Sequence, residues 1–221
     1  MAITKVTGGL LGNLAVGTEN VALGNTSLDA ITSGNYNTAI GSNAATDLTE
    51  GSLNTAIGRK SLFQVTTGGS NTGLGANSLY ALLTGSDNVA IGHNAMTNTT
   101  TASNNTAIGK SALLANTTGT QNVAVGALAL DAATTANNNT AVGYASLTGA
   151  TTGANNTAVG MNSMVANTTG GSNVAIGGSA LTSNTTASNN TAVGNDALAA
   201  NTGADGRNNT AVGASSMDAN T

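Results

Sequence analysis

The 221-residue sequence contains no cysteine, no proline and no tryptophan, and only three tyrosines and one phenylalanine. Without cysteine, the fold has neither disulfide bonds nor thiolate metal ligands. Charged residues make up 6% of the chain, and the large aromatic side chains are too few for a conventional core. A chain that is 39% apolar and lacks proline is also unlike a disordered segment. These absences favour order that arises from repetition.

Charge is scarce as well, with a net charge of −4. The five cationic residues form no basic stripe that could neutralise a run of phosphates, so we expect no nucleic-acid partner; they are Lys5, Arg59, Lys60, Lys110 and Arg207. The N-terminal segment MAITKVTGGLLGNLAVG has no continuous apolar run of the length that a signal peptide or a membrane span needs. We therefore expect neither export by the usual secretory route nor membrane insertion.

One six-residue word, NNTAVG, occurs twice within residues 138–160, and its second copy starts 17 residues after the first. The glycine that closes words of this kind recurs at ten consecutive intervals of 17 residues, from Gly24 to Gly194. A further copy ends at Gly213, two residues late because the segment GADGRN contains an insertion. A short and strict period is typical of solenoid proteins, so the period predicts the architecture of the chain.

The 17-residue unit keeps its residue types at fixed positions when it is numbered from its first asparagine. Position 1 is Asn in all twelve copies, from Asn20 to Asn209, and position 3 is Ala except for Gly73. Position 4 is Val, Ile or Leu, position 8 is Ala or Ser, and position 9 is Leu or Met except for Ala45. Position 13 is Thr except for Leu83. Residues 6, 7 and 10 of the unit vary freely between copies.

This pattern predicts an all-β fold. Common helical repeats need more than about 30 residues, and the Thr, Asn and β-branched content of the unit favours strands. The word NTAVG reads as a short strand and xALxA as a second element, with turns between them. The sequence has no Asn-Gly pair, which is the strongest hairpin signal. We predict a parallel β-solenoid of about twelve coils as one domain over residues 18–221, with a cap or attachment segment over residues 1–17.

Stacking of the coils explains why some positions do not vary. Equivalent positions in successive coils of a parallel solenoid lie about 4.8 Å apart, so the invariant Asn is expected to form a ladder of side-chain amides and the Thr of position 13 a ladder of hydroxyls. The Gly of position 5 permits a bend in the backbone. Positions 3 and 4 point to opposite faces of a strand, yet both are apolar. We therefore expect one face to pack in the chain's own core and the other against a partner subunit.

The unit NTAIGKSALLANTTGTQ, residues 105–121, resembles the 17-residue NTAIG…AL…NTTG repeats of phage tail-fibre-like proteins, which often precede a C-terminal chaperone domain. It is also similar to the AIGxxA repeats in the head domains of trimeric autotransporter adhesins, with three more residues per coil. The resemblance covers about 200 of the 221 residues and implies a homotrimer of parallel β-rolls. The sequence contains no recognisable chaperone domain or autotransporter membrane anchor.

Three features that could carry chemistry are better explained as solvent-exposed turns. The Gly-Lys-Ser of residues 109–111 resembles the end of a phosphate-binding loop, but Asn104 stands where that loop needs a glycine. His93 is the only histidine, and no other imidazole or carboxylate stands at ligand spacing from it. The acidic residues are spread along the chain, unlike the Asp-rich nonapeptides of calcium-binding β-rolls. We expect a protein that is not an enzyme, without catalytic residues, cofactor or metal site.

The first third of the repeat region is richer in large apolar residues than the rest. Position 12 is apolar in the first four full units and is Thr, Asn or Ala in the later ones. One interpretation is a locally wider core, which needs no partner. The other is a docking surface for another virion component at the N-terminal end. This predicted docking surface consists of Ile31, Tyr36, Leu48, Leu53, Phe63, Val65, Tyr80 and Leu82.

The sequence and its resemblance lead to a hypothesis of a non-catalytic fibre or shaft protein of a phage virion appendage, similar to a tail fibre. Such a protein assembles as a homotrimer in the host cytoplasm and ends in the virion. The alternative is a bacterial adhesin, extracellular or at the cell surface, whose variable positions 6, 7 and 10 bind a host-surface glycan or another surface. Ice binding is a third hypothesis, which is weakened because adjacent threonines of a TT pair point to opposite sides of a strand.

Overall fold

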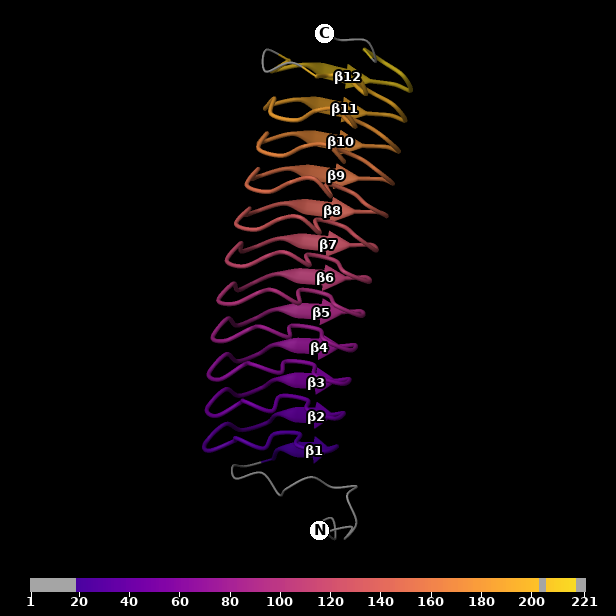
Figure 1. The fold of residues 1–221 in the computed structure, drawn as a ribbon. Helices are drawn as coiled ribbons and strands as arrows, with labels where there is room; N and C mark the ends of the chain where they lie inside the picture. The colour runs from indigo at the N-terminus through magenta and orange to yellow at the C-terminus, as the bar shows by residue number, and fades with distance from the viewer. Residues whose placement is uncertain (1–18, 203–205, 218–221) are drawn as a thin grey trace.

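The computed structural model describes residues 19–202 and 206–217, which form a slender stack of coils (Figure 1). Each coil contributes one three-residue strand, and the predicted cap over residues 1–17 lies outside the described residues. The strands are β1 (Val21–Leu23), β2 (Thr38–Ile40), β3 (Thr55–Ile57), β4 (Thr72–Leu74), β5 (Val89–Ile91), β6 (Thr106–Ile108), β7 (Val123–Val125), β8 (Thr140–Val142), β9 (Thr157–Val159), β10 (Val174–Ile176), β11 (Thr191–Val193) and β12 (Thr210–Val212).

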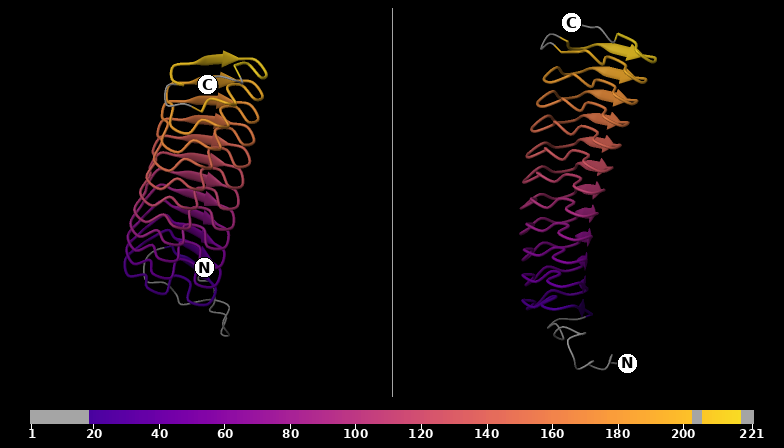
Figure 2. Two further views of the ribbon diagram at one scale, coloured as in Figure 1. Left: turned by 45° about the horizontal axis from the view of Figure 1, so that its top comes forward. Right: turned by 45° about the vertical axis from the view of Figure 1, so that its right-hand side comes forward.

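All twelve strands belong to one parallel sheet, and their order in the sheet is their order in the chain. Each strand pairs with the equivalent residues of the next coil, as Ala39 does with Ala56. Between β11 and β12 the partner of Thr191 is Thr210, so the insertion is accommodated outside the sheet and the register is kept. The views in Figure 2 show the strands stacked in one file along the rod. The predicted parallel β-solenoid is therefore confirmed.

The interior of the rod is narrow and is filled by the same positions of every coil. The Ala side chains of position 3 point inward and are fully buried in most coils, as at Ala56 and Ala107. Opposite them, the Leu or Met of position 9 supplies the largest buried side chains, for example Leu62 and Met96. Small residues on the strand therefore leave room for large side chains from position 9, and in the first four coils also from position 12, as at Leu48. Stacking of the coils produces a continuous core.

The invariant Asn residues form the predicted side-chain ladder inside this core. The Oδ1 atom of Asn37 accepts hydrogen bonds from the backbone N–H of Asn54 at 2.9 Å and from its Nδ2 at 3.1 Å. The Nδ2 of Asn54 also donates to the carbonyl oxygen of Gly68 at 2.9 Å, within the same coil. The same pattern repeats in the following coils, for example at Asn71. Each Asn amide thus hydrogen-bonds to the neighbouring coil and also to the backbone carbonyl of position 15 in its own coil.

The Thr hydroxyls of position 13 are also arranged in a row, but they do not bond to one another. Thr49 Oγ1 donates to the backbone carbonyl of Thr66 at 3.1 Å, and Thr66 Oγ1 donates to that of Leu83 at 3.0 Å. The threonine side chains therefore reinforce the backbone contact between coils. This use of the hydroxyl also explains why Leu83 can replace one threonine, since it still provides the carbonyl acceptor.

In the coils that the structure describes, the segment xALxA, predicted as a second element, is a turn without a strand. Its positions 7 and 9 have left-handed backbone conformations in successive coils, with φ of 57° at Lys60 and 50° at Leu62. The Leu62 N–H nevertheless donates to the carbonyl of Ser78 in the next coil at 2.9 Å. Coil-to-coil hydrogen bonds thus continue through this turn, and the alternating conformations direct the large side chain of position 9 into the core.

Candidate functional surfaces

The first candidate surface is the outer sheet face, which we define as the side chains of the first and third residues of strands β1 to β12. Every one of these residues is Thr, Val, Ile or Leu, so the face carries no charge along the whole sheet. Several of its large side chains are well exposed to solvent. They include Leu74 at 43%, Ile108 at 37%, Val123 at 37% and Ile176 at 41%. Most of the other side chains of this face are partly exposed, and a long uncharged face with exposed apolar side chains is typical of an interaction surface.

Positions 3 and 4 of the unit lie on opposite faces of the sheet. Position 3 faces the chain's own core, as at the fully buried Ala107. Position 4 faces outward, as at the neighbouring Ile108. The apolar residues of position 4 therefore contribute little to the core of a single rod, and their burial requires another molecule.

The predicted docking surface is divided by the structure. Its four position-12 residues are all in the core, with exposures of 6% at Ile31 and 0% at Leu48, Val65 and Leu82. These four cannot contact a partner, and their burial agrees with the interpretation of a wider core. Position 12 is also buried in the later coils, where it is Thr, Asn or Ala, for example at Asn116 and Ala133.

The other four members of the predicted docking surface reach solvent in two places. Tyr36 and Leu53 are 54% and 60% exposed, and each stands two residues before a strand, β2 and β3 respectively. Phe63 and Tyr80 are half-buried, follow β3 and β4, and stack on each other with ring centroids 5.2 Å apart and an interplanar angle of 13°. The eight residues therefore do not form one surface.

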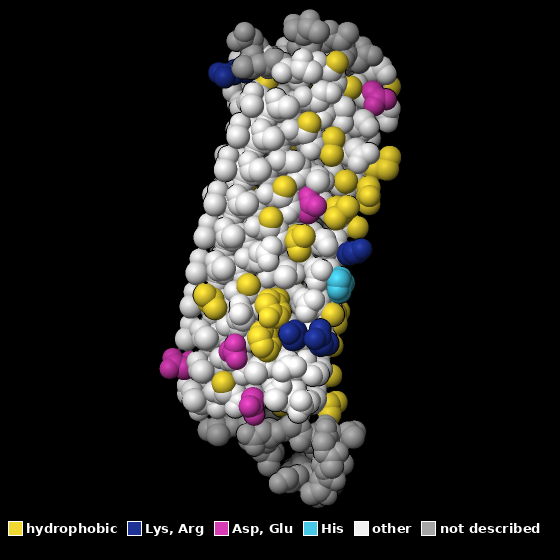
Figure 3. Space-filling model, in the orientation of Figure 1, with side chains coloured by type: hydrophobic (Ala, Val, Ile, Leu, Met, Phe, Trp, Pro, Cys, Tyr) yellow, Lys and Arg dark blue, Asp and Glu magenta, His cyan; other side chains and the backbone are white. Residues whose placement is uncertain are grey.

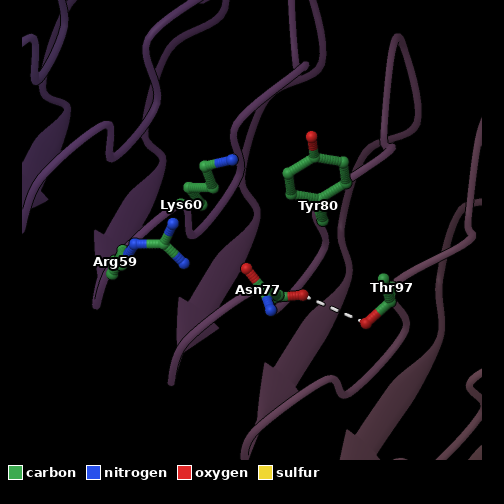
Figure 4. A pocket seen from close by; sticks show the side chains of 5 residues that line it. All are labelled: Arg59, Lys60, Asn77, Tyr80 and Thr97. Carbon is green, nitrogen blue, oxygen red and sulfur yellow. Dashed lines mark hydrogen bonds between the residues drawn. The ribbon is translucent and has the colours of Figure 1, made fainter.

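The second candidate surface is a hollow beside these stacked rings, which we call the basic pocket. Its volume is about 290 Å³, and it is lined by Arg59, Lys60, Asn77, Tyr80 and Thr97. Arg59 and Lys60 come from the turn after β3, Asn77 from the turn after β4, and Tyr80 and Thr97 from position 10 of successive coils. Figure 4 shows the five side chains around the hollow, and Figure 3 shows cationic and hydrophobic side chains together on one face of the rod.

Contacts within the basic pocket hold its side chains in place. The Lys60 ammonium lies 5.3 Å from the centre of the Phe63 ring and 5.6 Å from the centre of the Tyr80 ring, within the range of cation–π attraction. Thr97 Oγ1 donates to the backbone carbonyl of Asn77 at 3.2 Å (Figure 4). The Asn77 Nδ2 donates to Asn94 Oδ1 at 3.0 Å.

The adhesin alternative places the variable positions 6, 7 and 10 on one binding face, but the sequence does not indicate which coils form it. The structure brings them together because position 10 packs beside position 7 of the preceding coil. Where position 10 is Thr, its hydroxyl donates to that backbone, as Thr46 does to Thr26 at 2.9 Å. Phe63 and Tyr80 replace this Thr in two consecutive coils, next to two consecutive cations. The sequence feature that indicates this site is therefore a pair of adjacent cations beside aromatic residues at position 10 of two neighbouring units.

The remaining polar candidates stand apart from both surfaces. His93 and Lys110 are exposed, each at position 6 of its own coil. Asp131 is half-buried at position 10, and its Oδ1 has no hydrogen-bond partner. Burial raises the pKa of Asp131 above its usual 3.8, against the opposing effect of hydrogen bonds from the backbone of Ala132 and of Asp131 itself.

Residues 19–202 and 206–217 contain no cluster of three or more His, Cys, Asp or Glu side chains that could hold a metal ion. The same described residues include no helix with the length and apolarity needed to span a bilayer. No family model, curated protein or solved structure matches this chain. A solenoid fold does not by itself specify a function, so the function has to be argued from the two surfaces.

Proposed function

We propose that this chain is a non-catalytic shaft segment of a fibre and that three parallel copies assemble through their outer sheet faces. The observation that carries the proposal is the absence of charge on this face over all twelve strands, together with the exposure of its Ile, Leu and Val side chains. A monomeric rod would leave this whole length of apolar surface in water, at a cost of about 25 cal/mol per Å².

Other copies of the same chain suit this face better than an unrelated partner. Each strand presents outward a Thr or Val and then a Val, Ile or Leu, spaced by the distance between coils. Only a partner with the same period matches that spacing along the whole rod. Val, Ile and Thr side chains have few rotamers, so packing them against identical rows costs little entropy. The choice of three copies follows the resemblance of the repeat to trimeric fibre and adhesin proteins.

We place this fibre on a phage particle as a tail-fibre-like appendage, assembled in the host cytoplasm. The support for this role is the resemblance of the 17-residue unit to phage tail-fibre-like repeats. In this arrangement the N-terminal end joins another virion protein, and the exposed Tyr36 and Leu53 are the members of the predicted docking surface that can take part.

Immunogold electron microscopy with an antibody against the purified chain tests this role. The proposal expects gold particles on an appendage of virions from a lysate of the source culture, and none on the envelope of uninfected cells. Gold on the cell envelope together with unlabelled virions would replace the virion role with that of a cell-surface adhesin.

The adhesin is the second candidate function, and the basic pocket is the observation that favours it. Variable positions of three neighbouring coils converge there on one hollow, which a purely structural shaft does not require. The two roles are compatible, because the pocket and the outer sheet face share no residue. The pocket residues come from positions 6, 7 and 10, whereas the outer sheet face consists of positions 2 and 4.

A further inference from the structure

The basic pocket combines two kinds of group that are rare in this chain. Arg59 and Lys60 are two of only five cationic residues, and Tyr80 is one of only four aromatic residues. None of the residues that line the pocket carries a negative charge, although the chain as a whole has a net charge of −4. The pocket is therefore a local positive region on an otherwise weakly acidic rod, and it favours an anionic ligand.

The two cations are held so that they can act together. Consecutive residues in the turn after β3 place the guanidinium of Arg59 and the ammonium of Lys60 on the same side of the hollow (Figure 4). The Phe63 and Tyr80 rings fix the position of the Lys60 ammonium at 5.3 and 5.6 Å. Because the ammonium is already positioned, little conformational entropy is lost when an anion binds. A guanidinium and an ammonium together suit a carboxylate or a sulfate, which have several acceptor oxygens.

The other side of the pocket suits a sugar ring. Phe63 covers one face of the Tyr80 ring, while Thr97 lies one coil further along on the opposite side. The hydroxyls of Tyr80 and Thr97 and the amide of Asn77 line this side of the hollow and can hydrogen-bond to the hydroxyls of a sugar. A volume of about 290 Å³ is near the lower limit of small-ligand pockets, which is about 300 Å³, and thus fits one sugar unit of a longer chain.

We propose that the basic pocket binds an acidic sugar unit of a surface polysaccharide. The anionic group contacts Arg59 and Lys60, and the sugar hydroxyls bond to the polar groups of Tyr80, Asn77 and Thr97. A protein partner is less suited to this place, because a specific protein interface needs about 800 Å² on each side, far more than five residues provide. In the proposed trimer the pocket would occur three times, so that a polysaccharide with many acidic units would bind with avidity.

Fluorescence anisotropy with the intact chain tests this proposal. The probes are labelled oligogalacturonate, which carries carboxylates, and dextran sulfate, with neutral dextran and polyglutamate of similar length as comparisons. We expect at least one of the acidic saccharides to bind at least 10-fold more tightly than both comparison probes. The two acidic probes distinguish a carboxylate from a sulfate ligand. Equal binding of polyglutamate, or no preference over neutral dextran, would overturn the proposal.

Substitutions then locate the binding site. Arg59→Gln and Lys60→Gln are each expected to weaken binding at least 10-fold, and Tyr80→Thr at least 3-fold. Thr is already present at this position in other coils, for example Thr46, so the fold accepts it. Lys110→Gln is the matched control, because it removes the same charge from position 6 of another coil and should leave the affinity unchanged. A similar loss in Lys110→Gln and Arg59→Gln would show that only overall charge matters, and would refute the site. None of these residues lies on the outer sheet face, so this result is independent of the fibre proposal.

Discussion

The side-chain oxygen of Asn37 accepts two hydrogen bonds from Asn54, at 2.9 Å from the backbone and at 3.1 Å from the side chain. Asn54 in turn bonds to the carbonyl of Gly68 and accepts the backbone N–H of Asn71 at 3.0 Å. Asn54→Ala would leave the carbonyl of Gly68 and the backbone N–H of Asn71 without this side-chain partner in the interior of the rod. An unsatisfied buried group costs about 1 to 3 kcal/mol, so we expect a loss of about 3 kcal/mol in the free energy of unfolding, measured by urea denaturation.

Asn98→Ala is the matched control for this substitution. Asn98 is exposed at position 11, where several other coils already have Ala, for example Ala81 and Ala115. We expect a change of less than about 0.5 kcal/mol, as for surface substitutions in general. Similar losses for Asn54→Ala and Asn98→Ala would contradict the role assigned to the ladder.

Two neighbouring glycines of β4 and the following turn are expected to respond differently to alanine. Gly75 has φ of +136°, and an added Cβ would lie 2.6 Å from the carbonyl oxygen of Gly92, which is fixed backbone. Such a conformation and contact are costly for any residue with a Cβ, so Gly75→Ala should lower the free energy of unfolding by at least about 2 kcal/mol.

Gly73→Ala should be tolerated, although its Cβ would also meet close neighbours. Those neighbours are the side-chain ends of Leu62, Ser61 and Ser78. In another pair of coils the equivalent Ser146 and Ser163 share a hydrogen bond beside Ala158, so this group of side chains can accommodate a methyl group. We expect a change within about 1 kcal/mol in either direction, because Ala also restricts the unfolded chain. Thermal unfolding of both variants decides the point, and a larger loss for Gly73→Ala than for Gly75→Ala would refute it.

Asp131 predicts a pH dependence of stability. Burial raises its pKa in the folded protein above the usual 3.8, so the folded state binds this proton more readily than the unfolded state. Stability from this group therefore increases as the pH falls through the raised pKa towards 3.8, and it is lost as the pH rises. Relative to Asp131→Asn, the wild type should gain in melting temperature between pH 7 and pH 4. A difference in melting temperature between the two proteins that stays constant with pH, or changes in the opposite direction, would rule out this titration.

A charge placed on the outer sheet face should prevent assembly. Ile108→Lys puts an ammonium group among the uncharged side chains at which the copies meet, and an unpaired buried charge costs several kcal/mol. We expect this variant to elute as a folded monomer in size-exclusion chromatography with light scattering. Thr118→Lys adds the same charge at exposed position 14, away from the sheet, and should assemble normally. Assembly of both variants would exclude the outer sheet face as the interface.

The parts of the fold that were predictable from the sequence are those in which one coil contacts the next. A residue that stacks on its own equivalent, such as Asn54 on Asn37, must be retained in every unit, and so its role is visible in the repeat. The inward side chain of position 9 and the small residue of position 3 are visible for the same reason. Because the period is constant at 17 residues, it also predicts the register in which parallel strands of successive coils pair.

The surfaces were less predictable, because the direction of a side chain in a turn depends on backbone conformation. Left-handed residues at positions 7 and 9, such as Lys60 and Leu62, alter which way the following chain faces, and neither residue type signals that conformation. Position 12 was therefore assigned partly to a docking surface, whereas Leu48 and its equivalents lie in the core. The basic pocket joins residues from three coils, which the repeat average does not reveal.

The mass of the folded protein in solution tests the central claim, which is that apolar outer sheet faces hold three copies together. Sedimentation equilibrium in native buffer should give a single species at three times the chain mass of 21.1 kDa, and dilution to submicromolar concentration should not dissociate it. Circular dichroism on the same sample establishes that the chain is folded. A folded species that sediments at 21.1 kDa over the whole concentration range would contradict the account, because the rod would then be stable with its outer sheet face in water.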